Sequence, residues 1–231
     1  MFNKYNRIAR IYPAVICSVP IFLLNYFFLR LYTADLLTSL EGVKWIGGIT
    51  LSVALTFLLA QAGRFVGKEL FEKIHFKDEL YMPTTEFLLH SNNTYSPEHK
   101  NKVHTKILND FGIQIYSYKQ ENQDNLSARR VIVESVSMIR GKVKKGRLLL
   151  QHNIEYGFIR NLVGGSLIAL YISTANLYIL GVLFPNRLGF YISLCITMIY
   201  LFFVVIGRYL MGKYGIRYAK ILIQEYLFIQ G

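Results

Sequence analysis

Cysteine and acidic residues are scarce in this 231-residue sequence, and both shortages narrow what the protein can be. The two cysteines, Cys17 and Cys195, fall inside apolar runs, so we expect no disulfide framework. There are 14 Asp+Glu against 26 Lys+Arg, which gives a formal net charge of +12. This excess of positive charge favours partners that carry phosphates, such as nucleic acid or an anionic lipid surface.

The motifs of common enzyme classes are also missing. The sequence has no Gly-x-Ser-x-Gly and no P-loop, so we expect neither a hydrolase nucleophile nor a Walker-type nucleotide site. The five histidines lack the spacing of metal ligands: His99 and His104 are five residues apart, and the other three follow no recurring offset. We interpret His104 as a satisfied core residue. The sequence predicts no enzymatic activity, metal or cofactor.

Charged side chains are absent from long apolar stretches. Residues 11–29 and 45–62 contain none, and residues 161–207 contain only Arg187. Divided at residues 185–187, the last stretch gives two runs. Each of the four runs approaches or exceeds the roughly 20 residues that a helix needs to cross a hydrocarbon core. With a mean hydropathy of +0.31, the chain reads as a membrane protein with a water-facing part.

A short motif recurs at the ends of the second and fourth apolar runs: Gly-Arg-Phe at 63–65 and Gly-Arg-Tyr at 207–209. We predict an all-α membrane protein with four transmembrane helices, arranged as two hairpins with a mostly helical cytoplasmic domain inserted between them. The predicted parts are a first transmembrane hairpin (1–63), a basic cytoplasmic domain (64–160), a second transmembrane hairpin (161–208) and an amphipathic cytoplasmic tail (209–231).

Basic residues cluster on one side of the predicted spans. Residues 64–160 hold 16 Lys+Arg against 11 Asp+Glu, whereas the loops on the opposite side hold only Arg30, Lys44 and Arg187. Basic residues near span ends are retained in the cytoplasm. We therefore expect a multi-pass protein of the bacterial inner (plasma) membrane, with both termini cytoplasmic and the first span uncleaved.

Small residues form stripes along two of the spans. They recur every four positions at Gly48, Ser52, Thr56 and Ala60 in the second span, and at Gly165, Ala169 and Ser173 in the third. Such stripes let helix backbones approach closely in lipid. We expect these faces to assemble a homo-oligomer, with a tetramer as the working guess. Pro20, in the middle of the first span, should either bend its helix or have its freed backbone group satisfied by neighbouring helices.

No Asp, Glu, Lys or Arg lies within a span, which argues against an ion-coupled transporter or a proton pump. The sequence is compatible with a passive channel formed by several copies of the chain. The polar side chains that could line its pore are Asn25, Gln61, Asn176, Ser52 and Thr56; their other role is hydrogen bonding and packing between helices.

Helix signals run through the inserted domain. We expect a continuation of the second span over residues 64–76, a helix that starts at Ser96-Pro97 and stops at Gly112, and a buried helix over residues 126–139.

Three further segments of the cytoplasmic part are short. Thr84 or Thr85 is expected to cap a brief helix. Residues 113–115 alternate as a short strand would, and residues 119–125 read as a loop. The amphipathic tail either lies on the inner leaflet or packs on the inserted domain.

The strongest candidate site is a basic run in residues 140–147 that contains no acid. One interpretation is a polybasic segment held against anionic membrane lipid, and the other is a binding site for nucleic acid or a nucleotide. The predicted anion-binding residues are Arg140, Lys142, Lys144, Lys145 and Arg147, with Lys102 and Lys106; Lys100, Arg129 and Arg130 add to the positive charge of the domain.

Three features together resemble a known type of protein: Pro-Thr-Thr at 83–85 followed by Leu-Leu-His at 88–90, the segment 153–162 that leads into the third span, and the order hairpin, insert, hairpin. The chain resembles small bacterial four-span membrane effectors of phage-defence operons, such as the membrane component of Hailong systems.

The resemblance implies a homo-oligomeric channel that depolarises the cell. Its control would come from an oligonucleotide or cyclic nucleotide made by a partner nucleotidyltransferase, or from another cytosolic defence protein. The alternative is a non-conducting membrane scaffold or sensor that recruits a cytosolic partner protein.

Overall fold

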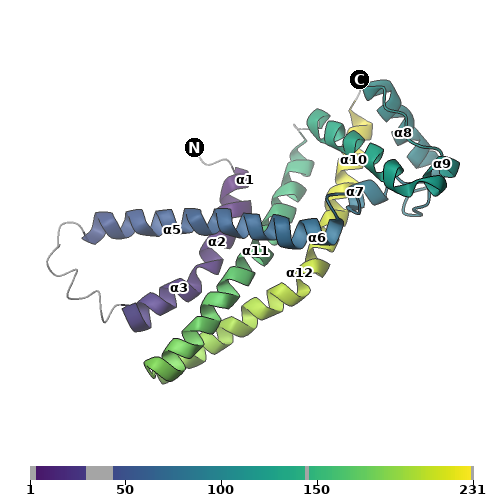
Figure 1. Cartoon of the computed structure of the whole chain (residues 1–231). Helices are drawn as coiled ribbons and strands as arrows, with labels where there is room; N and C mark the ends of the chain where they lie inside the picture. Colours follow the sequence, from purple (N-terminus) through teal and green to yellow (C-terminus); the bar gives the residue numbers. More distant parts are fainter. Residues whose placement is uncertain (1–3, 30–43, 144–145, 230–231) are drawn as a thin grey trace. The chain divides into compact units, whose positions relative to one another are not determined.

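The computed structural model describes residues 4–29, 44–143 and 146–229, and for residues 29 and 44–52 it describes the backbone alone. Within these ranges every regular element is a helix and no strand is present (Figure 1). The predicted all-α class is confirmed.

Three helical segments are long and apolar enough to cross a membrane: Lys4–Phe28, Arg147–Leu183 and Arg187–Phe228. The second predicted span falls in helix α5 (Lys44–Val66), where the side chains of residues 44–52 lie outside the described part. Three of the four expected spans thus have a membrane-length apolar helix, and the four-span topology stays a prediction.

The chain divides into two compact units. The first comprises residues 1–71 and 157–208, and the second residues 72–156 and 209–231. Helix α11 (Arg147–Tyr178) and helix α12 (Arg187–Phe228) each contribute residues to both units.

The N-terminal helix of the first unit is interrupted. It begins with α1 (Lys4–Asn6), and the break between α2 (Tyr12–Cys17) and α3 (Val19–Leu24) falls at Ser18, two residues before Pro20. Proline has no backbone N–H and crowds the preceding turn, so the helix cannot continue unbroken there. The regular helix is thus interrupted two residues before Pro20. The later segments are the π-helix η1 (Arg7–Ile11), α2 (Tyr12–Cys17), α3 (Val19–Leu24) and the π-helix η2 (Asn25–Leu29).

Helices α5 and α11 meet backbone to backbone. A Cβ atom on Gly63 would lie 3.3 Å from Gly165 Cα, and one on Gly164 would collide with the backbone of Gly63 and Gly67. Because only glycine allows this approach, these glycines position the two helices. Gly165 belongs to a predicted stripe, whereas Gly63, Gly67 and Gly164 lie outside both stripes. On the same stripe of α11, Ala169 and Ser173 are fully buried within the chain. Assembly of several copies through these faces stays a prediction.

The turn of the second hairpin lies close to residues 185–187, where the sequence predicted it. The π-helix η4 (Ile179–Leu183) follows α11, and α12 begins at Arg187. The Asn186 side chain accepts a hydrogen bond from Gly189 N at 2.9 Å, which satisfies a free N–H in the first turn of α12.

The second unit holds the inserted domain. Ser96 caps α8 by accepting from His99 N, and Gly112 ends α8 in the left-handed conformation, so the helix predicted there is confirmed. The helix expected over residues 126–139 is also confirmed, within α10 (Asn125–Lys142). The helices of this part are α6 (Lys73–Phe76), which follows the π-helix η3 (Gly67–Glu72), then α7 (Pro83–Glu86), α8 (Pro97–Phe111), α9 (Tyr118–Gln123) and α10 (Asn125–Lys142).

Three local predictions for the inserted domain are wrong. Residues 118–123 form helix α9, because Ser117 and Gln120 make a reciprocal capping box in what looked like a polar loop. Residues 113–115 form no strand, and Ile113 and Ile115 instead pack on the core. Helix α7 begins at Pro83, so Thr84 and Thr85 are buried inside it and cap nothing.

The C-terminal tail belongs to the core of the second unit. Ala219, Leu222, Ile223 and Tyr226 are fully buried in one apolar cluster with residues of the inserted domain. Of the two places proposed for the tail, packing on the inserted domain is the one observed. The other buried members are Phe87, Leu88, Leu89, Val103, Ile107, Ile132, Val136, Ile139, Val143 and Leu149.

Candidate anion-binding surface

The predicted basic run lies where helix α10 ends and helix α11 begins. Arg140 and Lys142 occupy the last turn of α10, and Arg147 is the first residue of α11. Cations at a helix C-terminus are favoured by the helix dipole. Lys144 and Lys145, between the two helices, lie outside the described residues.

Arg140 is engaged inside the domain. Its Nη1 donates to Glu79 Oε2 at 2.8 Å, its Nη2 lies 3.7 Å from Met82 Sδ, and its guanidinium sits 6.0 Å from the centre of the Tyr218 ring. Burial opposes the charged form, but the Glu79 carboxylate and Tyr218 raise the pKa of Arg140 above its ordinary value. Arg140 is thus engaged by other groups of the domain, and in the described part of the run the exposed cations are Lys142 and Arg147.

Lys142 and Lys106 converge on a single carboxylate. Lys142 Nζ lies 2.7 Å from Asp110 Oδ1, Lys106 Nζ lies 3.8 Å from Asp110 Oδ2, and the Tyr226 hydroxyl donates to Asp110 Oδ2 at 2.9 Å. The hydrogen bond from Lys142 lowers the pKa of Asp110, so this carboxylate is ionised at neutral pH. Two cations around one anion leave net positive charge.

An open groove of about 650 Å³ runs along the face of α8 that carries Lys102 and Lys106. Lys102 is exposed at its edge, and Lys106 also donates to Ile229 O at 2.7 Å. Amide and hydroxyl groups alternate with the charges, so the groove offers donors and acceptors to a polar ligand. Its lining residues are Glu98, Asn101, Lys102, Thr105, Lys106, Asn109 and Asp110.

Two other cations of the domain are structural. Lys100 is 4% exposed, and its Nζ donates to the carbonyls of Leu89, His90 and Asn92 at 3.1, 2.9 and 2.6 Å. The sequence carried a signal for this, because Lys100 shares the face of α8 that holds Val103 and is buried.

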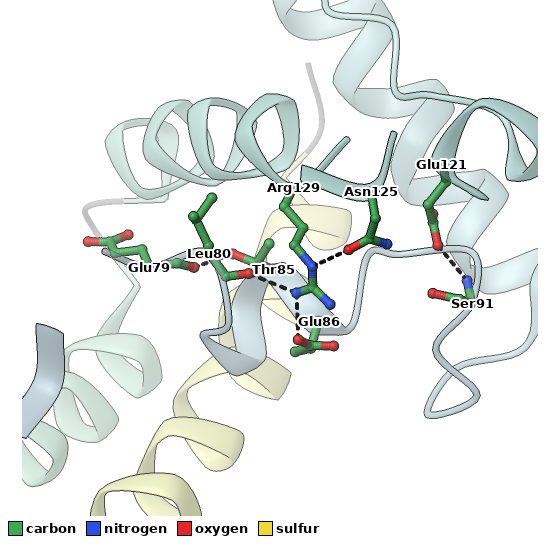
Figure 2. A network of polar contacts seen from close by, with 8 residues as sticks. All are labelled: Glu79, Leu80, Thr85, Glu86, Ser91, Glu121, Asn125 and Arg129. Carbon is green, nitrogen blue, oxygen red and sulfur yellow. Dashed lines mark hydrogen bonds and ion pairs between the residues drawn. The ribbon is translucent and has the colours of Figure 1, made fainter. Parts of the chain in front are cut away.

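Arg129 ties α10 to α7 (Figure 2). Its Nη1 contacts Glu86 Oε1 at 2.5 Å and donates to Leu80 O at 2.9 Å, and its Nε donates to Asn125 Oδ1 at 2.6 Å. The pairing with Glu86 joins residues 43 apart in sequence. The predicted contribution of Lys100 and Arg129 to a ligand surface is therefore wrong, since both side chains are buried against protein acceptors.

Glu121, in α9, makes hydrogen bonds to the backbone that follows α7 (Figure 2). Its carboxylate is 1% exposed and accepts from His90 N at 2.7 Å and Ser91 N at 2.9 Å. Burial opposes ionisation, but the bonds from Ser91 and His90 bring the pKa of Glu121 below its ordinary value. Sequence reasoning missed this role because Glu121 falls in the segment read as a loop.

One histidine, His104, packs at the core of the second unit. His104 is half-buried, with Nε2 2.8 Å from Leu88 O, which confirms it as a satisfied core residue. Burial lowers the pKa of His104 to about 4, so the ring is neutral at physiological pH. In the described ranges no three His, Cys, Asp or Glu side chains gather as a metal site requires.

The pore candidates occupy different environments in the first unit. Asn176 is fully buried and donates to Pro20 O at 2.7 Å. Asn25 is exposed, Gln61 and Thr56 are half-buried, and the Ser52 side chain lies outside the described part. A pore lined by these residues stays a prediction.

Comparison with protein-family models, with curated proteins and with solved structures gives no match for this chain. The class is therefore defined by the structure alone: an all-α protein with membrane-length apolar helices and a charged helical domain. The resemblance to membrane effectors of phage defence stays a hypothesis.

Proposed function

We propose that this protein is a bacterial inner-membrane effector of anti-phage defence that acts as an oligomeric channel. Its four spans form the permeation path, and an oligonucleotide or cyclic nucleotide bound to the basic surface of the cytoplasmic domain controls it. The proposed ligand contacts are Lys142, Arg147, Lys102 and Lys106, with Lys144 and Lys145 completing the run.

The observation that carries the proposal is the continuity of two helices. Arg147, at the edge of the basic surface, is the first residue of α11, and the same 32-residue helix contributes to the apolar unit from Gly157 onward. Helix α12 likewise supplies Tyr226 to the domain core and Tyr200 to the apolar unit. No loop separates the residues of the two units within either helix, and this continuity of backbone is what supports a coupling between ligand binding and permeation.

A ligand can move a gate only if it binds one arrangement more tightly than the other. A polyanion that bridges Arg147 and Lys142 of adjacent subunits would do so, because the spacing of those cations changes when subunits move. Lys106 and Lys142 share Asp110 in this structure, and a phosphate that competes for either lysine would weaken that pairing.

The test is ion flux through purified full-length protein in liposomes. The channel predicts a potassium leak that falls when Asn25 or Gln61 is replaced by Leu and is unchanged when Lys119, exposed on α9, is replaced by Gln. If the liposomes do not leak potassium and a cytosolic protein co-purifies in fixed ratio, the scaffold hypothesis would replace the channel hypothesis.

A further inference from the structure

A short segment of the second unit has a backbone conformation that its residues disfavour. Lys77, Asp78 and Glu79, directly after helix α6, have φ angles of 44°, 56° and 71°. Residues other than glycine rarely adopt this left-handed region, because their Cβ atom approaches the following carbonyl oxygen too closely. Gly112, at the end of α8, shows the ordinary solution, a single glycine at a φ of 69°. Three consecutive non-glycine residues therefore form a strained left-handed turn.

The hydrogen bonds inside this turn do not explain its handedness. Leu80 N donates to Lys77 O at 3.2 Å, and Tyr81 N donates to Phe76 O at 3.0 Å. If residues 77–81 continued helix α6, the same N–H groups would donate to the carbonyls four residues earlier. The composition also favours that alternative, since Lys, Glu and Leu are good helix formers. The strain must therefore be offset by contacts from outside the turn.

Three side chains from the rest of the second unit bind the end of the turn. Arg140 Nη1, on α10, donates to Glu79 Oε2 at 2.8 Å. Figure 2 shows the other two: Thr85 Oγ1 donates to Glu79 O at 2.8 Å, and Arg129 Nη1 donates to Leu80 O at 2.9 Å. The Glu79 and Arg140 side chains are only partly buried, so a group from solution can reach and compete for either. Of the three contacts, this ion pair is therefore the one that a solute can open.

We propose that the Glu79–Arg140 ion pair holds residues 77–81 in the left-handed turn, and that opening the pair lets them become right-handed helix. These residues would lengthen α6 by about 7.5 Å. The added helix would end before Pro83, because the residue that precedes a proline disfavours the helical conformation. A group that competes for Arg140 or Glu79 would shift the equilibrium between the two forms. The proposal concerns the second unit alone and does not rest on the channel.

Substitutions at Asp78 test whether the turn is strained. The Asp78 side chain is exposed, and its 3.7 Å contact with Lys73 is too exposed to contribute much. Asp78→Gly should raise the Tm of the full-length protein in detergent by about 3 °C, because glycine adopts the left-handed form without strain. It should also slow amide hydrogen exchange in residues 77–82 roughly fivefold. Asp78→Ala, which favours right-handed helix, should speed that exchange.

Arg140→Gln tests the ion pair. Exchange in residues 77–82 should become at least about tenfold faster, a larger change than in α8, and the backbone chemical shifts of residues 77–81 should take right-handed helical values. Adding Asp78→Gly to this variant should bring exchange back to within about threefold of wild type, because glycine relieves part of the strain. Arg130→Gln, at an exposed position on α10, should change none of these quantities.

Glu134 provides the control for the glycine substitution. It is exposed within α10, where the backbone is right-handed, so Glu134→Gly should lower the Tm. If Asp78→Gly also lowers the Tm, the turn is not strained and the proposal is wrong. It is equally wrong if Arg140→Gln leaves the exchange of residues 77–82 as in wild type, or if the chemical shifts of residues 77–81 in that variant are those of unfolded chain.

Discussion

The Tyr200 hydroxyl donates a hydrogen bond to Ile16 O at 2.7 Å. Ile16 is four residues before Pro20, so its carbonyl is the one that proline leaves without its normal helical donor. Tyr200 is 3% exposed and reaches this carbonyl from α12. In a hydrocarbon environment no water can replace the missing donor, and a neighbouring helix must supply it. Tyr200 thus explains how the first apolar helix tolerates a proline in its middle.

A double-mutant cycle tests this relationship. Tyr200→Phe should lower the stability of the first unit by about 1 kcal/mol in the wild-type background. In a Pro20→Ala background the new N–H can serve Ile16 O, so the same change should cost less than half as much. Thermal melting in detergent measures both. A loss of equal size in the two backgrounds would show that the hydroxyl does not compensate for Pro20.

Acid should destabilise the second unit through His104. Its folded pKa of about 4 lies below the ordinary 6.5, so the unfolded chain binds a proton that the folded chain excludes. This contribution is complete above pH 6.5 and is lost as the pH falls toward 4, with a magnitude on the order of 3 kcal/mol. Hydrogen exchange of the α8 amides at pH 7 and pH 4.5, corrected for intrinsic rates, should show it.

The matched variants for this measurement lie on the same helix. His104→Gln keeps a donor for Leu88 O but cannot titrate, so it should flatten the pH dependence. His99→Gln should leave it as in wild type. The Glu121 carboxylate, whose pKa is below its ordinary value, loses its contribution only at lower pH. If His104→Gln loses α8 protection with acid as steeply as wild type, the assignment to His104 is wrong.

The basic run should separate into a structural and a binding part. Arg140→Gln removes the pair with Glu79 and should destabilise the second unit by about 1 kcal/mol, since both partners are partly exposed. Arg147→Gln should leave stability unchanged and weaken binding of short single-stranded DNA, with a fall of about 0.7 in the slope of log K against log salt.

Lys119→Gln is the matched control for the DNA measurement, because Lys119 is exposed on α9 away from the run. It should alter neither stability nor the salt slope. A salt slope that is the same in wild type and Arg147→Gln would remove Arg147 from the ligand surface.

Lys100 should be among the costliest single substitutions in the second unit. Lys100→Met keeps the apolar stem but leaves three carbonyl oxygens without their donor, and we expect a loss of about 3 kcal/mol. Lys102→Met, at an exposed position two residues away, should change stability by no more than about 0.5 kcal/mol. Urea unfolding followed by hydrogen exchange in α8 compares them. Equal losses would mean that the contacts of Lys100 contribute nothing specific.

The sequence was informative where local chemistry decides the structure. Runs without charge predicted the membrane-length helices, and Ser96 and Gly112 predicted both ends of α8, because capping depends on neighbouring residues alone. Ion pairs between distant residues could not be read in this way. Arg129 pairs with Glu86 across 43 positions, and nothing near either residue distinguishes it from an exposed arginine.

The sequence predicted the candidate site as one group of basic residues. The structure shows which of them are engaged by other protein groups and which are exposed. Periodicity could have placed Lys100 on the buried face of α8, since it precedes Val103 by three positions. The engagement of Arg140 depends on Glu79, which lies 61 positions earlier, and on Tyr218 in the tail. Only the folded domain brings these groups together, which is why the sequence overcounted the charges available to a ligand.

We propose that an anion on the basic surface controls the permeability of the membrane unit. The most direct measurement is potassium flux from liposomes that contain the full-length protein, with and without a short single-stranded DNA on the domain side. We predict that the DNA changes the flux at least severalfold in wild type and in Lys119→Gln, and that Lys102→Gln combined with Arg147→Gln abolishes the response. Flux that the DNA leaves unchanged, or a response that survives in the double variant, would contradict the account.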